Sequence, residues 1–126
     1  MRGIDTNVLV RLLVGDDADQ AERARAYVTE HAPCWINRIV MCETVWVLER
    51  YYGLGRTRIA LALKQVLDTT QFEVEDVDAI QAGLLALDEG ADFADVVIAA
   101  TNRSRGCDAT ATFDRKASRL GGFEAI

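Results

Sequence analysis

Two acidic residues of this sequence each follow a short apolar run of the kind that forms strands. These residues are Asp5, after Gly3-Ile4, and Asp114, after the segment 109–113. In a parallel sheet, the carboxyl ends of the strands meet at one edge, and this edge is where open α/β sheets bind their ligands. We therefore expect Asp5 and Asp114 to lie near one another.

Two more acids accompany them within apolar helical segments. Asp95 stands in the first turn of a nearly all-apolar helix, and Glu43 lies between Met41-Cys42 and Val45-Trp46, a costly environment for an unpaired charge. If Asp5, Glu43, Asp95 and Asp114 converge, their repulsion raises their pKa values unless a cation compensates it.

A hard divalent cation fits this set of oxygen ligands. Four carboxylates offer oxygen ligands only, which favours Mg²⁺ or Mn²⁺. Such an ion activates water and stabilises a phosphoryl transition state. His31, the only histidine, lies at a helix end and is interpreted as structural, and no G-x-S-x-G, P-loop or G-x-G-x-x-G motif is present.

The elements that must position these residues alternate between strand and helix. Short strands are predicted at 3–4, 34–36, 72–75, 109–113 and 123–126, separated by helices at about 6–13, 17–30, 38–52, 56–67, 78–89 and 92–105. This order predicts an α/β fold, a three-layer α/β/α sandwich with a mostly parallel central sheet of about five strands. At 126 residues, the chain is expected to form a single domain over 1–126.

Composition limits the function further. The chain carries 14 basic and 20 acidic residues, a net charge of −6, so a generic basic nucleic-acid-binding surface is not indicated. Bound cations would supply the missing positive charge at a nuclease site. Three widely spaced cysteines and the lack of a long apolar run indicate a protein of the cytoplasm without a membrane segment.

Four segments, in this order along the chain, resemble the PIN domain family, specifically the VapC-type toxins of toxin–antitoxin pairs. They are Ile4-Asp5-Thr6-Asn7-Val8, Cys42-Glu43-Thr44-Val45-Trp46-Val47-Leu48, Ala91–Ala100 with the sequence ADFADVVIAA, and Thr112-Phe113-Asp114-Arg115-Lys116. The resemblance covers the whole chain. Two positions depart from the family pattern: Asn37 stands where Ser is frequent, and Ala117 stands where a bulky apolar residue is frequent.

The resemblance implies an activity and a set of roles. It assigns the catalytic, metal-binding quartet to Asp5, Glu43, Asp95 and Asp114, with Asn7 and Thr112 orienting the carboxylates or a water. It also implies Mg²⁺- or Mn²⁺-dependent endoribonuclease activity on RNA and a homodimer. A cognate antitoxin would inhibit the enzyme in a heterotetramer or a larger complex.

Several residues have a second interpretation. Asp5 and Asp92 could serve as helix caps, Asp92 alternatively as an outer metal contact. Arg115 and Lys116 are candidates for RNA phosphate contacts or ordinary surface cations. Trp46, Tyr51 and Tyr52, at helical spacing, fit a core or dimer contact better than base-stacking platforms.

Two other functions compete with the ribonuclease. The first is a non-catalytic partner in an antitoxin repressor complex, which a complete acidic quartet speaks against as the sole role. The second is an Asp-dependent phosphatase of the haloacid-dehalogenase type. That mechanism needs an acid two residues after the nucleophilic Asp, and Asn7 occupies this position.

Overall fold

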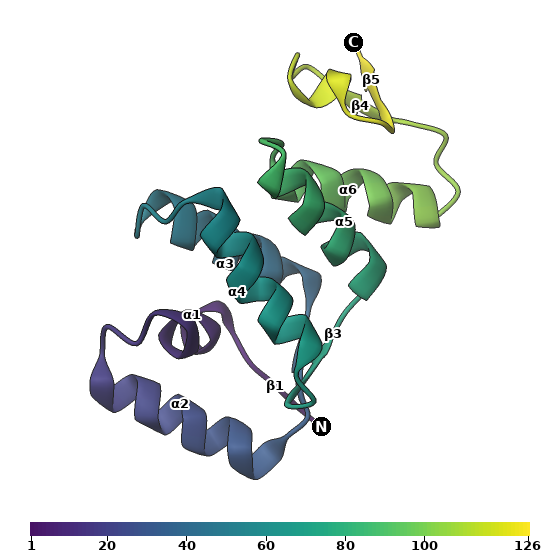
Figure 1. Cartoon of the computed structure of the whole chain (residues 1–126). Coiled ribbons are helices and arrows are strands. Elements are labelled where there is room, and N and C mark those ends of the chain that lie inside the picture. The colour runs from purple at the N-terminus through teal and green to yellow at the C-terminus, as the bar shows by residue number, and fades with distance from the viewer. The chain divides into compact units, whose positions relative to one another are not determined.

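The computed structural model describes all 126 residues, and the chain divides into two compact units, Met1–Val77 and Asp78–Ile126. Figure 1 shows the elements in chain order. We describe the two units separately. No helix in either unit has the length and apolar character needed to cross a bilayer.

The N-terminal unit contains three strands and four helices. The strands are β1 (Arg2–Gly3), β2 (Cys34–Ile36) and β3 (Phe72–Val74), and the helices are α1 (Thr6–Val14), α2 (Ala18–His31), α3 (Arg38–Arg50) and α4 (Arg56–Asp68). Both strand pairings are parallel, with β2 in the centre, and the register aligns Gly3 with Trp35 and Ile36 with Val74. Strand β3 therefore lies at an edge of this sheet.

Helix pairs connect these strands, as a parallel sheet requires. Helix α1 packs against α2 and α3, while α3 and α4 run side by side as a helical hairpin (Figure 1). The core of this unit is aliphatic and includes Leu9, Ile36, Met41 and Ile59, none of which exposes any surface. Burying each such side chain contributes about 1.5–3 kcal/mol.

The C-terminal unit is built on two helices, α5 (Val77–Asp88) and α6 (Phe93–Ser104). They approach closely at Gly83, where an added Cβ would lie 2.7 Å from Cε2 of the buried Phe93 ring. Glycine in a helix interior ordinarily costs about 1 kcal/mol relative to alanine, so its use here reflects this close approach.

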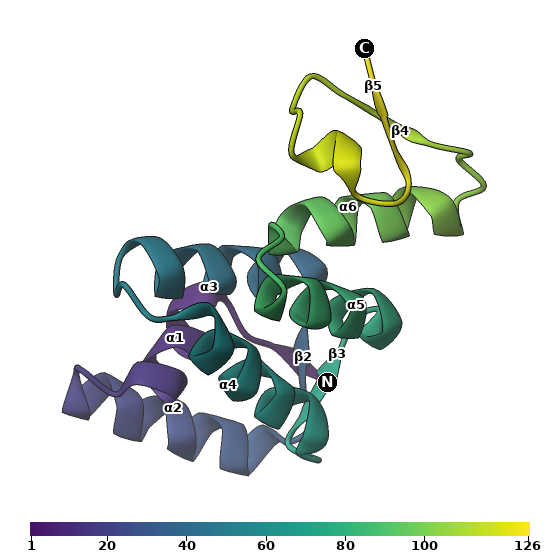
Figure 2. The same cartoon turned by 45° about the horizontal axis from the view of Figure 1, so that its top comes forward.

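Two parallel strands and a short 3₁₀ helix complete this unit. They are β4 (Thr110–Thr112), η1 (Ala117–Arg119) and β5 (Phe123–Ala125). Figure 2 shows β4 and β5 beside α6. Gly122, at φ +90°, leads into β5, and a Cβ there would meet Ala99 of α6 at 3.5 Å.

The α/β class, six helices and five parallel-paired strands agree with the sequence prediction, although the strands are shorter than expected and pair as three plus two. Two details were wrong. Tyr51 was interpreted as a core or dimer contact, but it is 78% exposed and is not a core residue. Trp46 is also exposed, so the expectation that it could be a core residue was wrong.

Candidate functional site

Asp5 follows β1 directly and begins α1. The backbone N–H of Ile4 donates to the carbonyl of Trp35 at 3.1 Å, which extends the strand pairing to the residue before Asp5. Asp5 is the N-cap of α1, and its Oδ1 accepts from the N–H of Val8 at 3.0 Å. The cap interpretation is therefore correct, and Thr6 and Asn7 belong to the first turn. Because the cap uses only Oδ1, Oδ2 carries no hydrogen bond and stays available to a ligand.

A single hydrogen bond connects Glu43 on α3 to the start of α1. The hydroxyl of Thr6 donates to Glu43 Oε1 at 3.2 Å, across the contact between α1 and α3. The expectation that Glu43 is surrounded by apolar side chains was wrong, since the residue is exposed while its neighbours Thr44 and Val45 are buried. Sequence reasoning had not selected Thr6, although its position directly after Asp5 was a usable signal.

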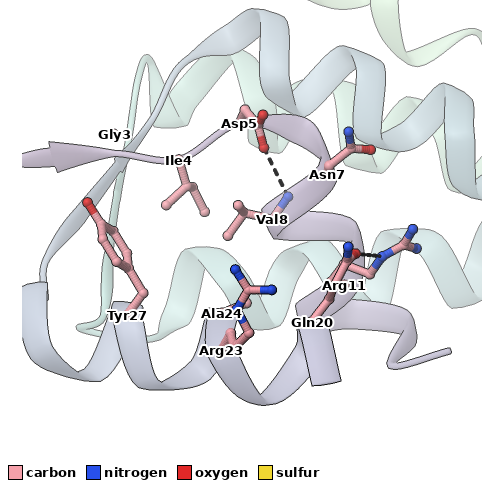
Figure 3. Close-up of a pocket in the computed structure, with 10 residues that line it drawn as sticks. All are labelled: Gly3, Ile4, Asp5, Asn7, Val8, Arg11, Gln20, Arg23, Ala24 and Tyr27. Carbon is pink, nitrogen blue, oxygen red and sulfur yellow. Dashed lines mark hydrogen bonds between the residues drawn. The ribbon is translucent and has the colours of Figure 1, made fainter. Parts of the chain in front are cut away.

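A pocket of about 620 Å³ opens beside Asp5 and Asn7, lined by β1, α1 and α2 (Figure 3). Much of its wall is apolar and comes from Ile4, Val8 and Tyr27. The pocket also contains two arginines that already have partners. These contacts are Arg11 with Asp16 at 3.0 Å, Gln20 at 2.7 Å and the Tyr52 hydroxyl at 3.0 Å, and Arg23 with Asp19 at 3.5 Å. The pocket therefore offers shape and apolar contact more than free positive charge.

Asp95 is the half-buried member of the set and lies in the first turn of α6. Burial raises the pKa of its carboxyl, and the nearby charges of Asp92 and Asp114 raise it further. Asp92 is the N-cap of α6, with Oδ1 accepting from the N–H of Asp95 at 2.9 Å. The cap role predicted as one option for Asp92 is thus confirmed, and Asp95 itself makes no hydrogen bond through its carboxylate.

Asp114 is held in a turn that follows β4. Its N–H donates to the hydroxyl of Thr112 at 3.0 Å, and its Oδ1 accepts from the N–H of Lys116 at 2.8 Å. Thr112 therefore contacts the backbone of Asp114, and its expected role in orienting a carboxylate or a water stays a prediction. As with Asp5, one carboxylate oxygen is used in a local turn while Oδ2 carries no hydrogen bond.

None of the four predicted metal ligands forms an ion pair. All ion pairs of the chain lie between residues 11 and 76 and involve other acids. Four carboxylates with at least one unused oxygen each and no neutralising cation are a donor set suited to a hard divalent ion. No group of three or more His, Cys, Asp or Glu side chains is already gathered to hold one. Since Asp5 and Glu43 belong to one unit and Asp95 and Asp114 to the other, their convergence stays a prediction.

The remaining candidates differ in their surroundings. Arg115 and Lys116 are exposed and make no ion pair, as expected of side chains that could contact phosphate. Asn7 is exposed at the edge of the pocket. His31 packs its ring against Tyr27 at a centroid distance of 4.4 Å, consistent with its structural interpretation, and none of the three cysteines forms a disulfide.

Among models of protein families, the one that matches this chain describes the PIN domain, over residues 4–122. The match includes all four predicted ligands. No curated protein and no solved structure matches the chain.

Proposed function

The chain belongs to the PIN domain family, whose members are typically metal-dependent nucleases, and on that premise we propose that it is an endoribonuclease dependent on Mg²⁺ or Mn²⁺. We further propose that residues 1–126 act as one PIN-like domain, that the metal ligands are Asp5, Glu43, Asp95 and Asp114, and that Asn7, Thr112 and Asp92 support them. Family membership favours this activity over a phosphatase of the haloacid-dehalogenase type.

One observation carries the proposal: the acids at the matching family positions are left without cations by the chain itself. Asp95 makes the point most clearly, because it is half-buried and forms no ion pair, and its pKa is raised by burial first and by the charges of Asp92 and Asp114 second. A protein that used these acids only for stability would pair them, as Glu75 and Asp76 are paired with Arg38 at 3.4 and 3.6 Å. The repulsion at Asp95 is the cost of keeping a cation site ready.

The side chains of the protein divide the work of the reaction. Asp5 offers Oδ2 while its Oδ1 caps α1, and Asp114 offers Oδ2 while its Oδ1 is held in the turn after β4. Both carboxylates are therefore oriented before a metal ion binds. Thr6 orients Glu43 in the same way. When bound, a divalent ion lowers the pKa of water and offsets the charge that develops on the phosphate. The proton that the attacking water loses would pass to one of these carboxylates.

The proposed biological setting follows the VapC-type resemblance. The nuclease would act as a cytoplasmic toxin and form a homodimer. A cognate antitoxin would hold it inactive in a heterotetramer or a larger complex, which can also repress transcription. Arg115 and Lys116 would contact RNA phosphates, since both are exposed cations without a partner.

The test is cleavage of a structured RNA pool by the purified protein with Mg²⁺, with Mn²⁺ and with EDTA. We expect cleavage that requires metal, stops in EDTA and is lost in Asp95→Asn. Cleavage that is equal in EDTA, or equal in Asp95→Asn, would contradict the proposal. Glu124→Gln, which neutralises an exposed acid on β5, is the control for charge removal alone.

A further inference from the structure

Phe113 is an aromatic side chain in an unusual place. Its exposed fraction is 84%, larger than that of any other large apolar residue in the chain. It stands between Thr112 and Asp114, two residues of the candidate site. A phenyl ring left in water forgoes the free energy that its burial would contribute, so an exposed ring at such a position indicates a ligand.

The backbone on both sides of this ring is fixed by hydrogen bonds. The Asp114 N–H donates to the Thr112 hydroxyl at 3.0 Å, and the Lys116 N–H donates to Asp114 Oδ1 at 2.8 Å. The Ser118 N–H donates to the Asp114 carbonyl at 3.0 Å, and its hydroxyl donates to the Arg115 carbonyl at 2.8 Å. An exposed ring on a turn held in this way is preorganised, so little conformational entropy is lost when a flat partner stacks on it.

The charges around this ring indicate the nature of that partner. Every basic residue of the C-terminal unit follows position 102, and none of them makes an ion pair; they are Arg103, Arg105, Arg115, Lys116 and Arg119. Three of them lie within six residues of Phe113. Unpaired cations beside an exposed aromatic ring are the combination by which proteins bind single-stranded nucleic acid, through phosphates and base stacking together.

We propose that Phe113 stacks on the base of a nucleotide next to the phosphodiester bond that is cut, and so positions unpaired RNA at Asp114. This inference rests on the proposed ribonuclease function. Stacking of this kind needs a base that is free of its helical neighbours, so the substrate segment is single-stranded where it passes Phe113.

The experiment compares KM and kcat for parent, Phe113→Ala, Phe113→Leu and Phe113→Trp on a short single-stranded RNA. We expect Phe113→Ala to raise KM about 5- to 100-fold while kcat changes little, because stacking contributes ground-state and transition-state binding alike. Phe113→Trp should restore KM to near the parent value, and Phe113→Leu, which keeps apolar volume without a π-face, should not. Leu85→Ala removes a similarly exposed apolar side chain, 70% exposed on α5, and is the matched control.

The possible results distinguish failure of the ribonuclease proposal from failure of the stacking role of Phe113. If the parent neither cleaves nor binds the RNA, the ribonuclease proposal fails and this one fails with it. If the parent cleaves and Phe113→Ala cleaves with an unchanged KM, only the stacking role is overturned. Equal rescue by Leu and Trp, or a loss of self-association in Phe113→Ala at unchanged KM, would assign Phe113 to an apolar protein contact instead.

Discussion

In the N-terminal unit both candidate carboxylates accept a hydrogen bond, whereas in the C-terminal unit only Asp114 does, and the half-buried Asp95 accepts none. Asp5 accepts from Val8 and Glu43 accepts from Thr6. Asp95, by contrast, accepts no hydrogen bond through its carboxylate and is opposed by Asp92 and Asp114. The cations show the reverse distribution: Arg11, Arg23, Arg38 and Arg56 are paired with acids, while none of the C-terminal ones is.

The two units therefore differ in which of their charges are paired within the chain. The N-terminal unit pairs four of its arginines with acids and supplies two candidate acids that accept hydrogen bonds. In the C-terminal unit none of the cations forms an ion pair, and neither Asp95 nor Asp114 does, so these charges remain available to groups outside the chain. Unpaired acids call for a metal ion, and unpaired cations call for phosphate.

The largest expected effect comes from an acid of the N-terminal unit. Asp5→Asn should reduce RNA cleavage at least about 100-fold, because even outer partners of metal ligands cost 10- to 100-fold when removed. Its stability should be unchanged, since the Asn side-chain oxygen can still accept from Val8. Asp5→Ala should lose the same activity and, in addition, about 1 kcal/mol of unfolding free energy with the cap. Equal stability of the two variants in denaturant titrations would contradict the dual role of Asp5.

The packing that positions Asp95 can be broken without touching a charge. Gly83→Ala should lower the unfolding free energy by about 1–3 kcal/mol, because the new Cβ would lie 2.7 Å from the buried Phe93 ring. Thermal melting measures the effect. Gly121→Ala, where a Cβ would meet nothing within 4 Å, is the control. A Gly83→Ala protein at least as stable as the parent would show that α5 and α6 are not in close contact.

The charge repulsion in the C-terminal unit predicts a pH dependence. Because the pKa of Asp95 is raised in the folded protein, its protonated carboxyl favours folding. This stabilisation is fully present at pH values below the ordinary pKa of 3.8 and is lost as the pH rises through the folded-state pKa. Asp95→Asn cannot ionise, so it should melt at a higher temperature than the parent at pH 7 in EDTA, and the advantage should shrink on acidification. If Asp95→Asn melts at a lower temperature than the parent at pH 7, another group compensates the charge of Asp95.

The unpaired cations predict the smallest effect. Lys116→Ala should weaken RNA binding only a few-fold at moderate salt and lower the slope of log K against log salt by about 0.7, the value for one phosphate contact on a single strand. This variant keeps the backbone N–H of residue 116, which donates to Asp114 Oδ1. Lys64→Ala, an exposed lysine on α4, should leave the slope unchanged. Equal slopes for Lys116→Ala and the parent would remove Lys116 from the RNA contact.

Much of this arrangement could be predicted from the sequence because local signals were strong. The helices expected at 17–30, 38–52 and 92–105 are present, and each follows a cap residue (Asp17, Asn37 or Asp92) whose side chain accepts from a backbone N–H three residues ahead. Helix α3 was harder, because its apolar residues do not single out one inner face. Its buried residues are Val40, Met41, Thr44, Val45 and Leu48, and Glu43 is exposed. The contact of Thr6 with Glu43 joins residues 37 positions apart, and no local pattern reports such a pair.

We propose that Asp5 and Asp114 are ligands of one metal ion. Titrating Mn²⁺ into the parent, Asp5→Asn, Asp114→Asn and the double variant measures this directly by calorimetry. We expect one binding event that either single substitution weakens strongly, with the double variant little worse than the singles, because ligands of one ion are not independent. Two independent binding events, each lost with only one of the two substitutions, would contradict it.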